Sequence, residues 1–133
     1  MKPSSRWIAL LSCCALISAF NGCSSDAPDD TLSGKITRNG LPLALQPDEQ
    51  IVVVAYELDA QGRLGTKSYS ANVDTTDGSY EMDIGPGKYR ISVVIVKPGE
   101  GDALKGKYSQ EGSTLVVDVD GSMEDYEIAV TDG

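Results

Sequence analysis

The sequence predicts an all-β protein, a seven-stranded antiparallel β-sandwich, and three features support this fold class. Apolar and polar residues alternate in most segments after residue 31, which is typical of strands with one buried face. Turn dipeptides such as Asn39-Gly40 and Asp77-Gly78 separate these segments. No convincing helical pattern follows the N-terminal stretch, whereas a parallel sheet would need helical crossovers.

The first 22 residues are expected to be a signal peptide. Lys2 and Arg6 give a positive start, and residues 7–20 form an apolar stretch of 14 residues. A permanent membrane-spanning helix needs roughly 20 such residues. Cys13 and Cys14 lie inside the stretch and would leave with it.

Gly22 and Cys23 end this stretch in a way that resembles the bacterial lipoprotein signal, in which the cysteine becomes the first residue and is acylated. The resemblance implies cleavage after residue 22 and a membrane anchor on Cys23. Two alternatives remain, an ordinary secretory signal followed by a chance cysteine and an uncleaved anchor. If Cys23 is acylated, no thiol is left for a disulfide, so the core alone must hold the fold.

The chain is acidic, with 20 acidic against 11 basic residues, no histidine and a net charge of −9. Loss of Lys2 and Arg6 with the signal leaves nine basic residues and a net charge of −11. This charge argues against a nucleic-acid partner, since phosphate binding needs a basic stripe. It also repels anionic lipid headgroups, so we expect attachment through the lipid alone.

Residues 23–31 are predicted to be the lipidated cysteine and an acidic tether, followed by one domain over residues 32–131. The tether residues 24–31 reach at most about 27 Å when extended, which keeps the domain close to the membrane. The first strand has Leu32, Gly34 and Ile36 on its inward face, and Asn39-Gly40 predicts a tight hairpin after it. Residues 41–45 contain Pro42 and predict a short edge strand or an irregular return.

Two further strands are expected next. Residues 51–58 are apolar without alternation, which favours a central strand with both faces partly covered. Residues 66–74 alternate again and place Tyr69, Ala71 and Val73 on one face.

Residues 74–96 are interpreted as turn, strand, tight turn and strand, the hairpin on which the other strands pack. Tyr80, Met82 and Ile84 form the inward set of its first strand. Gly85-Pro86-Gly87 interrupts the ladder, because proline lacks a donor and glycine permits the bend. Residues 88–96 form the second, β-branched strand.

The rest of the chain predicts a long loop and two strands. Residues 97–112 are rich in glycine and lysine and are expected to be an irregular, functional or mobile loop. Residues 114–120 form a strand with Leu115, Val117 and Val119 inward. The last strand has Tyr126, Ile128 and Val130 inward.

Residues 32–43, 76–81 and 85–91 carry a family resemblance. The first segment resembles the opening strand and turn of carboxypeptidase regulatory-like domains, and the other two look like their most recognisable stretch. The resemblance implies a transthyretin-like sandwich of the Greek-key type over nearly all of the mature chain. It implies no activity, because in carboxypeptidases this domain accompanies a separate catalytic domain, and fold does not fix function.

Candidate catalytic groups are few. Without histidine or a free thiol, the Ser-His and Cys-His routes to an activated nucleophile are closed. Glu81 and Asp83 lie two apart on one strand face and could form a carboxylate pair, but a solvated face explains them better. Lys35 could join an intramolecular isopeptide bond only if it were buried, and the alternation places it outward.

Metal and ligand candidates are equally limited. An acidic cluster surrounds one turn, but its spacing does not match the calcium-loop pattern; its members are Asp118, Asp120, Glu124, Asp125 and Glu127. Most tyrosines fall on inward positions, and Tyr108, in the long loop, is the one expected to be exposed.

We therefore expect a non-enzymatic, membrane-anchored lipoprotein whose β-sandwich is a structural or binding module at the bacterial cell envelope, without a cofactor. Ser24 after the cysteine favours the outer membrane. The candidate binding residues are in the long loop, since loops on a rigid scaffold carry recognition; they are Lys97, Lys105, Lys107 and Tyr108. The expected partner is an envelope protein or polysaccharide. The alternative is a carbohydrate- or calcium-binding accessory module, and a hydrolase is a third.

Overall fold

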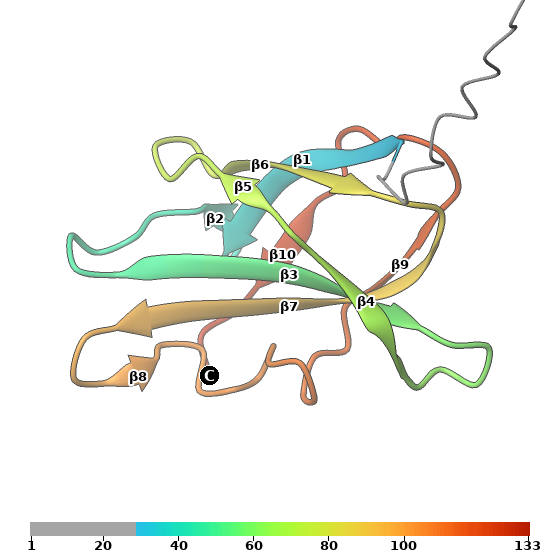
Figure 1. Cartoon of the computed structure of the whole chain (residues 1–133). Helices are drawn as coiled ribbons and strands as arrows, with labels where there is room; N and C mark the ends of the chain where they lie inside the picture. The colour runs from blue at the N-terminus through green and yellow to red at the C-terminus, as the bar shows by residue number, and fades with distance from the viewer. Residues whose placement is uncertain (1–28) are drawn as a thin grey trace, which may run out of the picture.

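The computed structural model describes residues 29–133, and this part of the chain is all β, without a helix (Figure 1). It contains ten strands, of which seven are three residues or longer. The predicted signal peptide and Cys23 lie outside the described residues. Within the described residues, no helix is long and apolar enough to cross a membrane.

The first sheet has the strand order β10-β1-β6-β5, with β2 also paired to β1. Its strands are β1 (Asp30–Arg38), β2 (Leu41–Pro42), β5 (Asn72–Val73), β6 (Ser79–Ile84) and β10 (Ile128–Val130). The turn between β1 and β2 has positive φ at Asn39 (56°) and Gly40 (80°), which confirms the predicted tight hairpin. All pairs in this sheet are antiparallel except β1 with β10, where Ile36 lies opposite Ile128.

The second sheet has the order β4-β3-β7-β8, with β9 also paired to β7, and is antiparallel throughout. Its strands are β3 (Gln50–Leu58), β4 (Leu64–Ser70), β7 (Gly87–Lys97), β8 (Gly101–Asp102) and β9 (Val116–Val119). The two sheets pack face to face as a sandwich, which confirms the predicted fold class (Figure 1).

The predicted hairpin over residues 74–96 was wrong in its pairing. β6 pairs with β1 and β5, whereas β7 pairs with β3, β8 and β9, so Gly85-Pro86-Gly87 carries the chain from one sheet to the other. Proline cannot donate to a ladder and Gly87 has φ 150°, so this tripeptide suits a crossing between sheets. The Tyr89 hydroxyl donates a 2.8 Å hydrogen bond to the Gly85 carbonyl and braces the crossing.

A second crossing closes one side of the sandwich. β4 pairs with β3 in the second sheet, and β5, one residue later, pairs with β6 in the first. At the switch, the Ala71 amide donates to the Val53 carbonyl at 2.9 Å. The predicted single strand over residues 66–74 is therefore two strands that serve different sheets.

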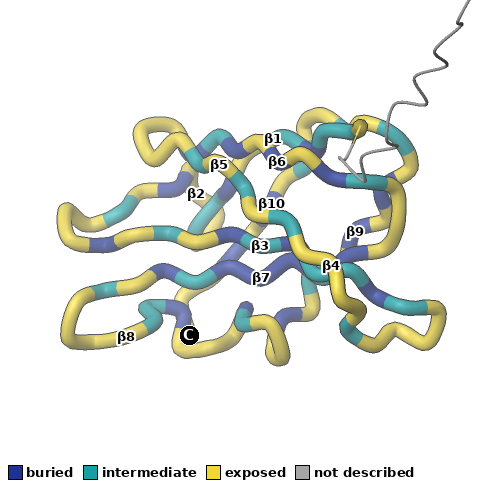
Figure 2. The backbone as a smooth tube through the Cα atoms, in the orientation of Figure 1, coloured by how far each residue is buried: buried dark blue, intermediate teal, exposed yellow. Residues whose placement is uncertain are grey.

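The core follows the predicted alternation (Figure 2). The inward residues of β6, Tyr80, Met82 and Ile84, are all buried, and Glu81 and Asp83 between them are exposed. β3 also alternates: Val53 is buried, whereas the side chain of Val52 on the outer face is half exposed. Its central position in the sheet is confirmed, but its outer face is less covered than its apolar sequence suggested.

Gly34 fills a position where the chain leaves no room for a side chain. Residues 123–126 bulge between the parallel contacts of β1 with Met123 and with β10. A Cβ on Gly34 would lie 2.0 Å from the Tyr126 carbonyl oxygen. The same oxygen accepts a 2.7 Å hydrogen bond from the Tyr80 hydroxyl. A buried side chain of β6 therefore holds the bulge in place.

Candidate functional site

The loop over residues 97–112, which was predicted to carry the binding residues, packs against the core of the sandwich. It contains the short strand β8 and a series of turns, and Leu104 within it is completely buried. The prediction that Tyr108 is exposed was wrong, because only 7% of the residue is accessible. Its hydroxyl accepts a 3.1 Å hydrogen bond from the Thr131 amide, which ties the loop to the C-terminal segment.

The three predicted lysines do not gather around one site. Lys107 donates to the Thr131 hydroxyl at 2.6 Å and lies 5.4 Å from the centre of the Tyr108 ring. Lys105 is exposed in a turn with φ 55°. Lys97 pairs with Glu100 at 3.2 Å and lines a different hollow, described next.

That hollow has a volume of about 430 Å³ and lies where β1, β2 and the end of β7 meet. Arg38 dominates it and makes two ion pairs, with Glu49 at 2.9 Å and with Asp132 at 2.8 Å. The hydrogen bonds from Arg38 hold the pKa values of both carboxyl groups below their usual range. Arg38, Glu49 and Asp132 pair with one another, so this hollow is better explained as a partly buried structural network than as a ligand site.

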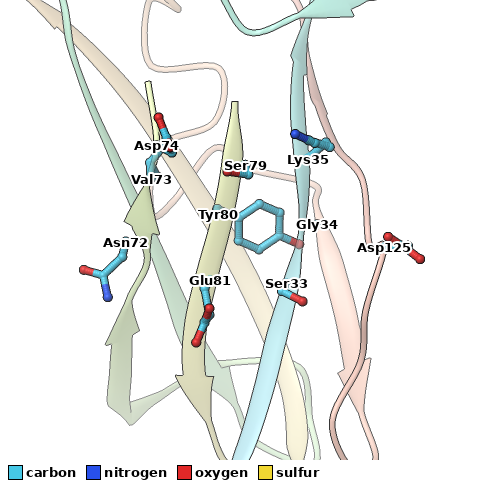
Figure 3. Close-up of a pocket in the computed structure, with 10 residues that line it drawn as sticks. All are labelled: Ser33, Gly34, Lys35, Asn72, Val73, Asp74, Ser79, Tyr80, Glu81 and Asp125. Atoms are coloured by element: carbon cyan, nitrogen blue, oxygen red, sulfur yellow. The ribbon is translucent and has the colours of Figure 1, made fainter. Parts of the chain in front are cut away.

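A larger hollow, of about 490 Å³, lies on the outer face of the first sheet over β1, β6 and β5 (Figure 3). The strand register builds it: Ser33 on β1 is opposite Glu81 on β6, and Glu81 is opposite Asn72 on β5. These three side chains therefore form a row across three strands, on the face opposite the core. Asp125 adds a carboxylate beyond β1 (Figure 3).

One end of this hollow is fixed by an ionic network. Lys35 on the outer face of β1 donates to Asp77 at 3.0 Å. The hydroxyl and the amide of Ser79 also donate to Asp77, at 2.7 and 2.9 Å. These hydrogen bonds, led by the Ser79 hydroxyl, hold the pKa of Asp77 well below its usual range, so it stays ionised.

The side chains of the row itself are free. Among residues 29–133, the side chains of Ser33, Asn72, Glu81 and Asp125 make no hydrogen bond or ion pair with other protein groups, so they are available to a ligand. Sequence reasoning singled out Glu81 but missed Ser33 and Asn72. The outward alternation marks all three, but only the pairing of β1, β6 and β5 shows that they are neighbours.

The remaining candidates from the sequence are the isopeptide lysine, the carboxylate pair and the acidic metal cluster. Lys35 faces outward as predicted, and its side chain and that of Asp77 are 57% and 51% exposed, unlike the buried pair that isopeptide chemistry needs. Glu81 and Asp83 share one exposed face, as predicted. Across residues 29–133, no three acidic side chains come close enough together to hold a metal ion.

In comparisons with known proteins, no protein-family model, no curated protein and no solved structure matches this chain.

Proposed function

We propose that this chain is a non-enzymatic, lipid-anchored β-sandwich module at the bacterial cell envelope. The observation that carries the proposal is Gly22-Cys23 at the end of a 14-residue apolar stretch, close before the first strand. β1 begins at Asp30, seven residues after Cys23, and seven residues span at most about 25 Å. A lipid on Cys23 would thus hold the sandwich against the membrane.

We also infer that the sandwich is a carboxypeptidase regulatory-like, transthyretin-like domain. Two features of the resembling segments support this. Asp77-Gly78 leads into β6 with Tyr80 buried, and Gly85-Pro86-Gly87 leads into β7 with Tyr89 buried. These positions serve the packing of the two sheets, which agrees with a family whose motifs concern the fold and not an activity.

A non-enzymatic role is supported by the chemistry that the chain offers. Histidine is absent, and the only cysteines are Cys13, Cys14 and Cys23. Within residues 29–133, the amine of Lys107 lies 2.6 Å from the Thr131 hydroxyl, but it donates to that hydroxyl and does not accept its proton as a general base would. Binding through fixed polar side chains is therefore the better proposal.

The test is membrane fractionation of the full chain and of Cys23→Ala, expressed in a diderm bacterium and labelled with palmitate. We expect labelled wild-type protein in the outer-membrane fraction and an unlabelled variant that is lost from it. Cys13→Ala is the matched control and should behave as wild type, because Cys13 leaves with the signal. A Cys23→Ala variant that stays in the membrane at the same size as wild type would overturn the proposal in favour of an uncleaved anchor.

A further inference from the structure

We propose that the hollow over β1, β6 and β5 is a saccharide-binding site, in which the row of Ser33, Glu81 and Asn72 holds the hydroxyl groups of a neutral glycan. The inference rests on the proposed function, since an envelope module next to the membrane meets glycans there.

The geometry of the row is the first support. Ser33 is the register partner of Glu81 on β6, and Glu81 is the register partner of Asn72 on β5, so the three residues lie on the same outer face of the sheet. Neighbouring strands are about 4.8 Å apart, so the row spans about 10 Å. A rigid sheet sets this spacing, so the polar groups are fixed before a ligand arrives and little ordering is needed on binding.

The chemistry of the row is the second support. The Glu81 carboxylate can accept from two adjacent hydroxyl groups, the Asn72 amide can donate and accept, and the Ser33 hydroxyl can do both. A sugar ring offers neighbouring hydroxyl groups that match this set. The charged residues that line the hollow are Lys35, Asp74, Glu81 and Asp125, one positive and three negative, so a phosphate or an acidic polymer is repelled.

The availability of these groups separates this hollow from the one at Arg38. There, Arg38, Glu49 and Asp132 are bound to one another, so a ligand would have to break ion pairs. Here, the side chains of Glu81, Asn72 and Ser33 make no hydrogen bond with the described part of the protein, so a ligand's hydroxyl groups can bind them without breaking an ion pair.

The position of the row also suits a glycan close to the bilayer. Ser33 lies three residues after Asp30, about 10 Å along β1 from the point where the tether joins the sandwich. With an extended tether, the row lies within roughly 35 Å of the membrane surface.

The test uses the full chain, isotope-labelled and purified in detergent, titrated with maltose and with the disaccharide of N-acetylglucosamine while amide chemical shifts are recorded by NMR. Glucuronic acid is the anionic comparison. We expect at least one neutral disaccharide to shift the amides of Ser33, Asn72 and Glu81, with a dissociation constant on the order of 1 mM. Glu81→Gln should weaken this binding by about tenfold, a loss of 1.4 kcal/mol of binding free energy.

Asp83→Asn is the matched control, because Asp83 lies on the same strand and the same exposed face but does not line the hollow. It should bind as wild type does. No shift at these amides with either neutral disaccharide at roughly 50 mM, well above the expected constant, would overturn the proposal. So would equal binding by Glu81→Gln, or binding of glucuronic acid alone. None of these results concerns acylation of Cys23, so the proposal of a lipid-anchored module would stand even if the saccharide site were refuted.

Discussion

Replacing Gly34 by alanine should destabilise the sandwich strongly, although the change adds only one methyl group. The new Cβ would meet the Tyr126 carbonyl oxygen at 2.0 Å and the Tyr126 carbonyl carbon and amide nitrogen at 2.7 Å. Backbone atoms cannot rotate away as a flexible side chain does, so the bulge over residues 123–126 must move. Overpacking of this kind costs about 1–3 kcal/mol.

Two further effects adjust the magnitude. Moving Tyr126 breaks the hydrogen bond that its carbonyl accepts from Tyr80, worth about 1 kcal/mol. Alanine lowers the entropy of the unfolded chain, which returns about 0.4–1 kcal/mol. The net loss should be about 1–3.6 kcal/mol, and for a domain of this size the Tm should fall by about 4–8 °C for each kcal/mol lost.

Urea unfolding followed by circular dichroism measures this loss. Gly85→Ala is the matched control, because its Cβ would meet only the hydroxyls of Tyr69 and Tyr89, at 3.8 and 3.9 Å, and its φ is not positive. It should change the free energy of unfolding by less than about 0.5 kcal/mol. If Gly34→Ala is as stable as Gly85→Ala, the described packing of residues 123–126 on β1 is incorrect.

Three other changes test the packing and the ion pairs. Leu104→Ala should cost about 2–5 kcal/mol of unfolding free energy, because the side chain is completely buried; a loss below 1 kcal/mol by the same urea assay would mean that the loop is a mobile excursion after all. Glu49→Gln should make the stability depend less on pH under acid conditions. Arg38 lowers the pKa of Glu49 in the folded protein, so the ionised carboxylate stabilises the fold above about pH 4.3. This contribution is lost as the pH falls through the folded pKa of Glu49. Urea midpoints of wild type and Glu49→Gln, measured from neutral to acid pH, would fall in parallel if the Arg38–Glu49 pair contributes nothing. Burial raises the pKa of Tyr89 to about 12, so its contribution to stability is complete below about pH 10 and is lost as the pH rises towards 12. The difference in ultraviolet absorbance between wild type and Tyr89→Phe isolates this side chain and should show no ionisation at about pH 10; ionisation there would contradict its burial.

Local patterns in the sequence predicted the strands and their faces well. Alternation placed Tyr80, Met82 and Ile84 in the core because a half-buried strand has a period of two, and each of them is buried. Asn39-Gly40 predicted its hairpin because few dipeptides accept two consecutive residues with positive φ. Such signals lie within a few residues and need no knowledge of the partner strand.

What could not be predicted depends on partners far away in the chain. Whether Gly85-Pro86-Gly87 closes a hairpin or crosses between sheets depends on the strands already beside β6 and β7, which the tripeptide does not encode. Tyr108 looks exposed in its glycine-rich segment, but Thr131, 23 residues later, binds its hydroxyl. The row of Ser33, Glu81 and Asn72 was missed for the same reason, since it joins three separate strands.

The pairing of β6 with β1 and β5 is the feature to measure first, because both the two-sheet arrangement and the row of Ser33, Glu81 and Asn72 depend on it. Nuclear Overhauser effects recorded on the isotope-labelled full chain should connect Glu81 with Ser33 on one side and with Asn72 on the other. If Glu81 instead contacts Ile91 on β7, then β6 and β7 form a hairpin around residues 85–87, and both the crossing and the proposed site are wrong.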